Sequence, residues 1–258
     1  MIRQGSGEPL VLLHGITLTE HSWQGVVPHL ASSHDVIVPT ALGHHGGRAP
    51  GRMPVVMTDV IGDAERTLDE LGLDRAHLVG NSMGGWAALE LARRGRALSV
   101  CAISPAGLWE SGGEDMERVY AILRAAIRDT RRTRKLLPLL ARSRRFRRYA
   151  YRYLSADGGH VPAAELIAGA DDLIACQVIP DPATPEALPA LDPVPCPVTI
   201  AWGTVDRLFP LDRYRRNAER LVPGARFVVL DGVGHVPMLD DPELVARTIL
   251  AAAEPPAR

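Results

Sequence analysis

Short apolar runs alternate with longer amphipathic stretches along most of the chain. The runs have the length of strands and are apolar throughout, as is typical of parallel strands covered on both faces. They lie at residues 9–13, 36–39, 76–79, 98–103, 198–202 and 227–230. Apolar residues at steps of three and four predict helices over residues 55–71, 83–94, 211–221 and 243–253. Strand and helix in alternation predict an α/β protein with a mostly parallel, doubly wound sheet.

The alternation stops between residues 108 and 195. This segment has a helical and basic pattern at first, and then seven prolines occur between residues 180 and 197. Proline-rich stretches form stiff connections, so we expect an insertion that returns to the sheet through a rigid linker. The sequence therefore predicts a core domain made of residues 1–107 and 196–258, and an inserted helical cap made of residues 108–195.

Composition favours one soluble domain. The 258 residues suit one large α/β domain, and the 46% hydrophobic and 23% charged residues are close to the average of soluble globular chains. No apolar run approaches the ~18 residues of a membrane-spanning helix, so we expect a cytoplasmic protein without a membrane span. The three cysteines lack the spacing of a disulfide or zinc site, which predicts buried, reduced thiols. Nothing in the sequence implies a metal or a cofactor.

Positive charge is concentrated in the predicted cap. The formal net charge is only −1, but residues 124–152 hold twelve basic residues against the single acid Asp129. All of these but Lys135 are arginines, whose guanidinium groups suit carboxylates and phosphates. Two interpretations stay open: a solvated helical face, or a surface that attracts an anionic substrate or an acidic carrier protein bearing an acyl thioester. Nucleic acid is not expected as a partner, because no aromatic ladder accompanies the charge.

The stretch LVGNSMGGWAALELA, residues 78–92, has the most specific pattern in the chain. A predicted strand ends at Gly80, Ser82 follows, and a helix rich in alanine and leucine begins at once. A turn this sharp needs small residues at Gly80 and Gly84, and it lifts the Ser82 hydroxyl clear of the sheet. A serine here also suits a plain helix N-cap, but capping does not explain the flanking glycines. We therefore predict that Ser82 is a nucleophile.

Backbone N–H groups near Ser82 are candidate donors to an oxyanion. Met83 begins the following helix, where N–H groups have no intrahelical partner and the helix dipole is positive. A second donor is expected from the strand that stops at His14 and Gly15, with the N–H of Ile16 next in the chain. His14 itself is interpreted as a structural loop histidine rather than a base.

A serine nucleophile requires a base, and a carboxylate that orients the base. His235 follows the last predicted strand on a loop that contains glycines, and among the nine histidines it alone suits the expected order of serine, acid and histidine. Asp206 leaves the preceding strand at the same edge of the sheet, where ligand sites of open α/β sheets collect. Asp231 is the rival carboxylate, although its place at the end of a strand suits a loop cap better.

These motifs together resemble the α/β-hydrolase fold superfamily. The resemblance rests on an HG loop, a nucleophile elbow, an acid turn and a histidine turn, at residues 14–15, 80–85, 202–206 and 234–235. It implies a catalytic set and an oxyanion hole made of Ser82, Asp206 and His235, and of the amides of Ile16 and Met83. Two features depart from the family pattern: few residues precede the first strand, so the usual N-terminal hairpin is expected to be shortened or absent, and PTALGHHGG has a doubled histidine.

The resemblance implies hydrolysis of a carboxylic ester, thioester or lactone through an acyl-enzyme on Ser82. A serine at the elbow excludes the haloalkane dehalogenase and epoxide hydrolase branches, which use an aspartate there. Three alternatives stay open: a carbon–carbon bond hydrolase of the meta-cleavage type, whose elbow GNSMGG resembles, an acyl-carrier thioesterase, and a non-catalytic ligand receptor or lyase on the same fold. We expect a small acyl substrate, with Trp23 and Trp109 lining its pocket, although both suit a core equally well.

Overall fold

The computed structural model describes residues 1–109, 114–178 and 187–254. Within these residues, one seven-stranded sheet has the order β1-β3-β2-β4-β5-β6-β7. The strands are β1 (Ile2–Gln4), β2 (Glu8–Leu13), β3 (His34–Val38), β4 (Ala76–Asn81), β5 (Ala97–Ile103), β6 (Val198–Gly203) and β7 (Arg226–Leu230). The pairs from β3 to β7 are parallel, so the predicted mostly parallel, doubly wound sheet is confirmed.

The first edge of the sheet is formed by β1, a strand of three residues. It pairs antiparallel with β3, in a register that sets Ile2 opposite Val38. Because it is so short, the edge offers few unpaired backbone groups to another chain. Within the described residues, β1 does not pair with the next strand β2, so the edge is a single short strand and not an N-terminal hairpin.

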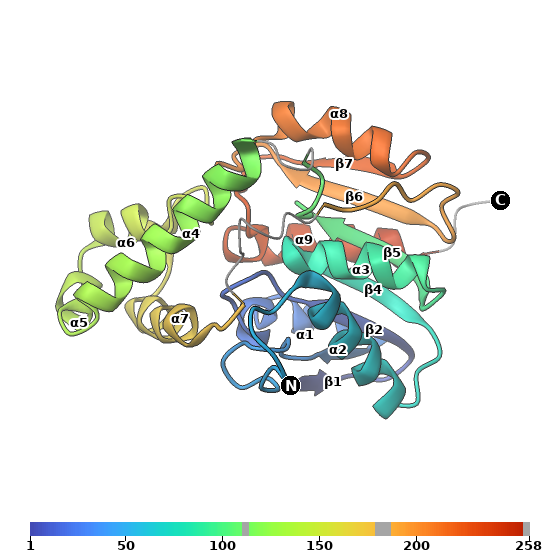
Figure 1. Ribbon diagram of the computed structural model, residues 1–258, viewed down its shortest axis with the longest axis horizontal. Coiled ribbons are helices and arrows are strands. Elements are labelled where there is room, and N and C mark those ends of the chain that lie inside the picture. The colour runs from blue at the N-terminus through green and yellow to red at the C-terminus, as the bar shows by residue number, and fades with distance from the viewer. Residues whose placement is uncertain (110–113, 179–186, 255–258) are drawn as a thin grey trace.

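Helices cover both faces of the sheet (Figure 1). Leu10 and Leu12 point to the face packed by α1 (Val27–Leu30) and α9 (Pro242–Ala253). Val11 and Leu13 point to the other face, because successive side chains of a strand alternate. That second face is packed by α2 (Met57–Glu70), α3 (Met83–Arg93) and α8 (Leu211–Leu221).

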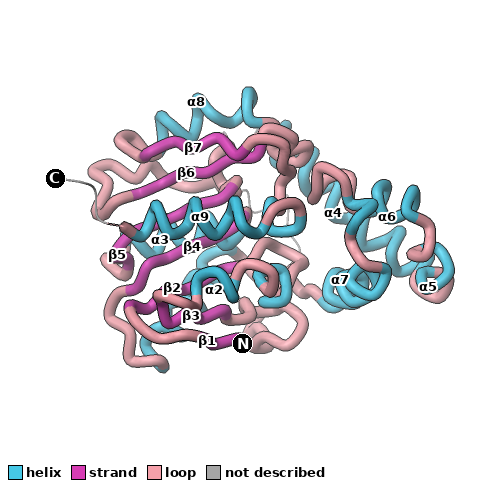
Figure 2. The backbone as a smooth tube through the Cα atoms, turned by 180° about the vertical axis from the view of Figure 1, so that it is seen from behind, coloured by secondary structure: helices cyan, strands magenta, loops and turns pink. Residues whose placement is uncertain are grey.

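Four helices between β5 and β6 project away from the sheet, as the views from the two sides show (Figures 1 and 2). They are α4 (Glu114–Thr133), α5 (Leu137–Leu140), α6 (Arg144–Ala150) and α7 (Ala163–Ala175). The last three, with the loops beside them, share a small core made of Leu137, Ala141, Tyr151, Val161, Leu166 and Ala170. Buried residues of α4, such as Met116 and Val119, belong to the cluster on the second face of the sheet. We call these helices and the loops between them, residues 114–178, the cap; the division of the whole chain into a core domain and a cap stays a prediction.

The structure also bears on the expectations for membrane-spanning helices and for the cysteines. Among the described residues, none of the helices combines the length and the apolar composition that crossing a bilayer requires. The three cysteines are free, and burial raises the pKa of Cys101 to about 12. Cys101 and Cys176 are buried as expected, whereas Cys196 is only half-buried.

Candidate active site

Ser82 occupies a sharp turn between β4 and α3. Its backbone has φ 54° and ψ −115°, a strained conformation for a residue with a side chain. A Cβ on Gly80 would overlap the carbonyl of Gly84, and one on Gly84 would overlap the carbonyl of Leu13 in β2. Ser82 is the residue before α3, but its side chain makes no capping hydrogen bond to that helix, so capping does not account for the serine.

Backbone hydrogen bonds fix the Ser82 turn against the neighbouring strand. The N–H of Ser82 donates to the carbonyl of Ile103 at 3.0 Å. The carbonyl of Ser82 accepts from the N–H groups of Trp86 at 3.1 Å and Ala106 at 3.0 Å. The strained residue therefore keeps one conformation, because its backbone is bonded to β5, to α3 and to the loop after β5.

Asp206 and His235 meet at the carboxyl end of the sheet, although they lie 29 residues apart. Nδ1 of His235 lies 2.8 Å from Oδ2 of Asp206, and both side chains are almost fully buried. The other carboxylate oxygen, Oδ1, accepts the N–H groups of Leu208 at 2.9 Å and Phe209 at 2.7 Å. Since the carboxylate accepts, Nδ1 carries the proton, and this leaves Nε2 as the basic nitrogen.

The basic nitrogen of His235 is available. Within the part of the chain that the structure describes, Nε2 is buried and has no hydrogen-bond partner, the Ser82 hydroxyl included. The imidazole packs edge-on against the Phe209 ring, with 4.7 Å between ring centroids. Phe209 and Ser82 line the same cavity, so the His235 imidazole packs against a residue of the cavity wall. Bonds between a nucleophile and its base are often loose without substrate and tighten in the complex.

The Asn81 side chain binds the backbone of His235. Its Nδ2 donates to the carbonyl of His235 at 2.8 Å and to that of Ile103 at 3.2 Å. Asn81 thus joins the histidine loop to the strand that neighbours the elbow. Sequence reasoning did not assign it a role, because its partner lies 154 residues away.

Two buried histidines shape the loop after β2. The N–H of Ala41 donates to Nε2 of His14 at 3.0 Å, and the N–H of Thr17 donates to Nε2 of His44 at 3.2 Å. Both Nε2 atoms are acceptors, so each Nδ1 carries the proton and donates to a carbonyl, of Gly15 or of Leu42. Burial lowers the pKa of His14 to about 4 and, with His14 close by, that of His44 to about 3. Both rings are therefore neutral at pH 7, and the structural interpretation of His14 agrees with these bonds.

The two expected oxyanion donors, Ile16 and Met83, line the cavity together with Ser82. Met83 is the first residue of α3, so its N–H has no intrahelical acceptor. Ile16 lies between Gly15 and Thr17, the residues that the two histidines hold. The positions expected for the donors are thus on the same cavity wall as the serine.

A cavity with mostly apolar walls lies over the elbow. Its walls come from the loop after β2, the elbow, the loops after β5 and β6, and the helix α4 of the cap. The aromatic and aliphatic side chains among them are Ile16, Val55, Met57, Met83, Trp86, Ala106, Trp109, Val119, Tyr120, Leu123, Val178, Leu208 and Phe209. Pockets with such walls bind hydrophobic ligands.

Only one of the two tryptophans expected in the pocket lines the cavity. Trp109 lines the cavity and packs edge-on against Trp86, with 5.9 Å between ring centroids. Trp23 does not line it, which corrects the expectation. It ends the 3₁₀-helix η1 (Glu20–Trp23) and is fully buried among residues of α1 and α9, on the opposite face of the sheet. Its short distance along the chain from the HG loop was therefore misleading.

The described residues hold no group of three or more histidine, cysteine or acidic side chains arranged for a metal ion. The doubled histidine divides into two roles. His44 supports the loop after β2, while Nδ1 of His45 lies 2.7 Å from Oδ1 of Asp172 in α7. His45 thus connects the core to the cap.

Comparison with known proteins agrees with this geometry. The model of the alpha/beta hydrolase family matches residues 10–248. The chain belongs to the alpha/beta hydrolase family. The resemblance predicted from the four motifs is thereby confirmed, and the protein is a hydrolase of this fold.

Two relatives and one solved structure of the same fold are named for three different reactions. It is 36% identical to epoxide hydrolase EphH of Mycobacterium tuberculosis over 205 residues, 74% of this chain and 91% of the relative. It is 31% identical to the pimeloyl-[acyl-carrier protein] methyl ester esterase of Aromatoleum aromaticum over 251 residues, 91% of this chain and 93% of the relative. A solved meta-cleavage product hydrolase of Pseudomonas fluorescens has the same fold, with a TM-score of 0.74 and 19% identity over 97% of this chain and 93% of that one.

Proposed function

We propose that this hydrolase cleaves esters of hydrophobic carboxylic acids, thioesters and lactones included, through an acyl-enzyme on Ser82. The observation that carries the proposal is a buried His235, bound to Asp206 through Nδ1 and with no partner for Nε2 among the described residues, in a chain whose strained elbow carries Ser82. The apolar walls of the cavity above Ser82 favour an aliphatic or aromatic acyl group.

The proposed reaction begins when Nε2 of His235 accepts the proton of the Ser82 hydroxyl. The serine oxygen attacks the ester carbonyl, and the carbonyl oxygen becomes negative as the carbon becomes tetrahedral. The N–H groups of Ile16 and Met83 donate to this oxygen. The ester bond then breaks as His235 returns the proton to the departing alcohol. A water, activated by the same imidazole, releases the acid from Ser82.

Asp206 stays ionised throughout this reaction. It stabilises the imidazolium that forms and keeps the proton on Nδ1, so that Nε2 faces the serine. Its second oxygen is bound by two backbone N–H groups, those of Leu208 and Phe209. These bonds orient the carboxylate before the substrate arrives.

The name of the first relative raises epoxide hydrolysis as a competing reaction. An oxygen of serine that attacks an epoxide carbon forms an alkyl ether, which has no carbonyl for water to attack. An aspartate in the same place forms an ester, which water can cleave. With Ser82 at the elbow, we therefore expect epoxides to be poor substrates.

Cleavage of a carbon–carbon bond in a vinylogous diketone is the second candidate. The elbow sequence GNSMGG and the similarity to the fold of a meta-cleavage product hydrolase favour it. The loop after β2 counts against it, because HGITLTEHSW lacks the glycine-rich stretch expected of such enzymes. A ring-cleavage dienone in the substrate panel separates the two reactions.

We also propose a partner for the basic cap, an acidic carrier protein that bears the acyl group. The far end of the cap exposes a basic and apolar surface, the tip face, made of Arg132, Lys135, Leu136, Leu139 and Arg142. Leu136 and Leu139 are 61% and 66% exposed, and none of the three cations has a carboxylate partner among the described residues. Exposed cations around apolar side chains suit an acidic protein surface that carries apolar residues of its own.

The position of the tip face fits such a partner. Figures 1 and 2 place α5 at the end of the cap that lies farthest from the sheet. The helix α4 runs from this end to the cavity, where Val119, Tyr120 and Leu123 line the wall. A carrier bound at the tip would reach Ser82 only with an acyl group on a long flexible arm. The esterase relative is named for a substrate on an acyl carrier protein.

The partner is tested with the double variant Arg132→Glu/Arg142→Glu. We expect this variant to lose turnover of a carrier-bound acyl ester at least tenfold and to keep turnover of a free short ester. The wild-type rate with the carrier should also fall as salt is added. Equal rates for the variant and the wild type with the carrier-bound ester would exclude the tip face as a docking site.

The chemistry is tested by labelling and by substrate profiling. A fluorophosphonate should add to Ser82, as mass spectrometry of the tryptic peptide would show. A panel of p-nitrophenyl esters, acyl thioesters, a lactone, an epoxide and a ring-cleavage dienone should show the fastest turnover with the esters. Loss of that turnover in Ser82→Ala is expected to reach at least about 10³-fold. Tight ligand binding without turnover of any compound would instead identify a receptor.

A further inference from the structure

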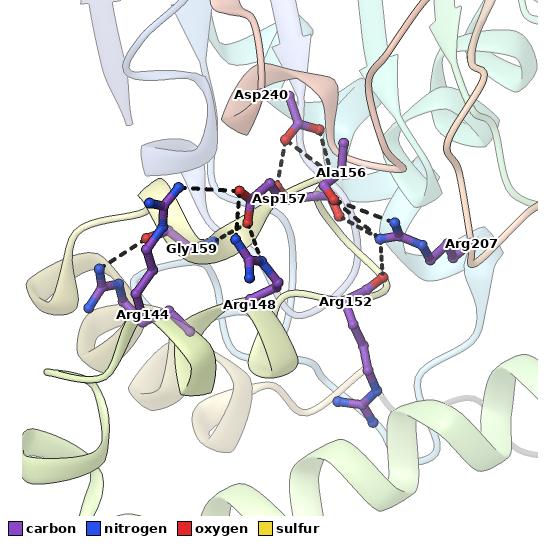
Figure 3. Close-up of polar contacts among 10 residues, drawn as sticks. Arg144, Arg148, Arg152, Ala156, Asp157, Gly159, Arg207 and Asp240 are labelled. Atoms are coloured by element: carbon purple, nitrogen blue, oxygen red, sulfur yellow. Dashed lines mark hydrogen bonds and ion pairs between the residues drawn. The ribbon is translucent and has the colours of Figure 1, made fainter.

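Part of the cap runs between the two loops that hold Asp206 and His235. We call this part, residues 152–156 between α6 and α7, the bridging segment. Figure 3 shows it between Arg207, which follows Asp206 in the chain, and Asp240, which lies five residues beyond His235. The cap is therefore joined to the candidate active site at a second place, apart from the cavity wall.

The bridging segment touches the backbone on both sides of His235. The N–H of Val236 donates to the carbonyl of Leu154 at 2.7 Å. On the other side, a Cβ on Gly234 would lie only 2.8 Å from the carbonyl carbon of Ser155. A side chain at position 234 would therefore collide with the backbone of the cap, which explains the glycine.

Asp240 binds both partners of this contact with one carboxylate. Its Oδ2 accepts the N–H of Gly234 at 2.8 Å and that of Ala156 at 3.0 Å. Its Oδ1 accepts the hydroxyl of Ser155 at 2.5 Å and the N–H of Ala156 at 3.1 Å. A single anion thus links the residue before His235 to two residues of the cap, through charge-assisted hydrogen bonds.

Arg207 binds the opposite side of the bridging segment. Its guanidinium donates to the carbonyls of Arg152 at 3.2 Å, Ser155 at 3.2 Å and Ala156 at 3.4 Å. Asp240 thus accepts hydrogen bonds from the segment, and Arg207 donates hydrogen bonds to it. Arg207 is next to Asp206 in the chain, and Asp240 binds Gly234, which is next to His235. The bridging segment is therefore bound by one residue close to each member of the Asp206–His235 pair.

We propose that Asp240 and Arg207 are positioning residues that clamp the bridging segment, and through it hold the His235 imidazole in register with Asp206 and Ser82. The inference rests on the proposed function, since it assigns a duty to the pair that would activate Ser82. Neither residue touches the substrate or the reacting atoms. A shift of the cap that opened the clamp would release the imidazole, so the position of the cap controls the reactivity of the serine.

The clamp is tested with Asp240→Asn and Arg207→Met. Asp240→Asn keeps the shape of the side chain and removes its charge, and Arg207→Met keeps the unbranched stem and removes the guanidinium. Misplacing a catalytic group by about 1 Å costs up to about 100-fold in rate. We expect kcat for p-nitrophenyl butyrate to fall about 10- to 100-fold with KM changed less than about threefold. Asp240→Glu, which keeps the carboxylate, should recover part of the loss, and Ser155→Ala should show a smaller fall in the same direction.

Matched controls separate positioning from general loss of stability. Asp241→Asn makes the same change one residue away, where the carboxylate caps α9 through the N–H of Leu244 at 2.8 Å. Arg216→Met removes an exposed guanidinium of α8. We expect both controls to keep the wild-type kcat, even if Asp241→Asn lowers the melting temperature. A fall in kcat of Asp241→Asn equal to that of Asp240→Asn would overturn the proposal.

A second readout does not depend on activity. The Nδ1 proton of His235, held against Asp206, should give a downfield resonance in the ¹H NMR spectrum, assigned by its loss in His235→Gln. We expect the clamp variants to broaden or shift this signal and the two controls to keep it. If the wild type lacks Ser82-dependent hydrolysis, the proposed function fails and this signal alone decides the clamp. An unchanged signal together with an unchanged kcat in Asp240→Asn and Arg207→Met would overturn it.

Discussion

At the elbow, residues 80–86, backbone atoms hold one another, whereas at the tip of the cap, residues 131–145, the side chains of Arg131 and Arg134 bind the neighbouring helix α7. The strain at Ser82 persists because strand, helix and loop backbones surround it. At the tip, Arg134 binds Asp171 at 2.5 and 2.7 Å, while the neighbouring Arg132 and Lys135 face solvent. The elbow is thus intolerant of change, whereas we expect the tip to tolerate substitutions.

The largest difference is expected from a single methyl group. In Gly84→Ala, the new Cβ would overlap the backbone of β2, so we expect a loss of about 3 kcal/mol or more in the free energy of unfolding. Gly62→Ala is the matched control, because Gly62 lies in α2 and a Cβ added there would meet no atom within 4 Å. Alanine should stabilise that helix by up to about 1 kcal/mol. Urea denaturation of the two variants measures both effects, and equal stabilities would contradict the tight packing of the elbow.

Acid should act on the loop after β2 before it acts on the tip. The pKa of His14 is about 4 in the folded chain against 6.5 as the ordinary value, so the unfolded chain binds more protons as the pH falls below 6.5. Stability is therefore complete above pH 6.5 and is lost as the pH falls towards 4. The loss from His14 is on the order of 3 kcal/mol, since one pKa unit equals about 1.4 kcal/mol.

This pH dependence is measured by urea denaturation between pH 7.5 and 4.5. His14→Gln should flatten the dependence, and His29→Gln, at an exposed position of α1, should leave it as in the wild type. A wild-type slope in His14→Gln would show that the ring is not held neutral. His44, with a pKa of about 3, should add to the loss over the same range and further down to pH 3.

The smallest effect is expected at the ion pair of the tip. Arg134 and Asp171 are 33% and 45% exposed, and ion pairs this open contribute little. Arg134→Met should leave both the urea midpoint of unfolding and kcat/KM for a short ester close to the wild-type values. A fall in kcat/KM beyond tenfold would show that the tip also shapes the cavity, and would remove the contrast with the elbow.

The same contrast explains what the sequence could predict. The elbow is contiguous, and its geometry requires glycine and a hydroxyl residue at fixed steps, so Ser82 was visible in one stretch. The family was visible only in the four motifs taken together. The Asp206–His235 pair was predicted from chain order and from the edge of the sheet where their loops end, and the structure places the two side chains in contact. Local chemistry carried these predictions.

Residues whose partners lie far along the chain were not predicted. Asn81 binds a carbonyl 154 residues away, and Asp240 binds the cap 85 residues away. Trp23 failed for a related reason, since a short chain distance from the HG loop does not say on which face of the sheet a side chain packs. The contacts of these residues depend on how the chain packs in three dimensions, and the pattern of apolar residues alone does not predict that packing.

The covalent intermediate on Ser82 is the most direct measurement of the proposed chemistry. The protein would be mixed with p-nitrophenyl butyrate, quenched in acid within milliseconds, and its peptides weighed by mass spectrometry. We expect a butyryl group on the peptide that contains Ser82, with a burst of one p-nitrophenol per chain when release of the acid is slow. Turnover of the ester with no acyl adduct on Ser82, or with unchanged turnover in Ser82→Ala, would contradict a serine nucleophile at the elbow.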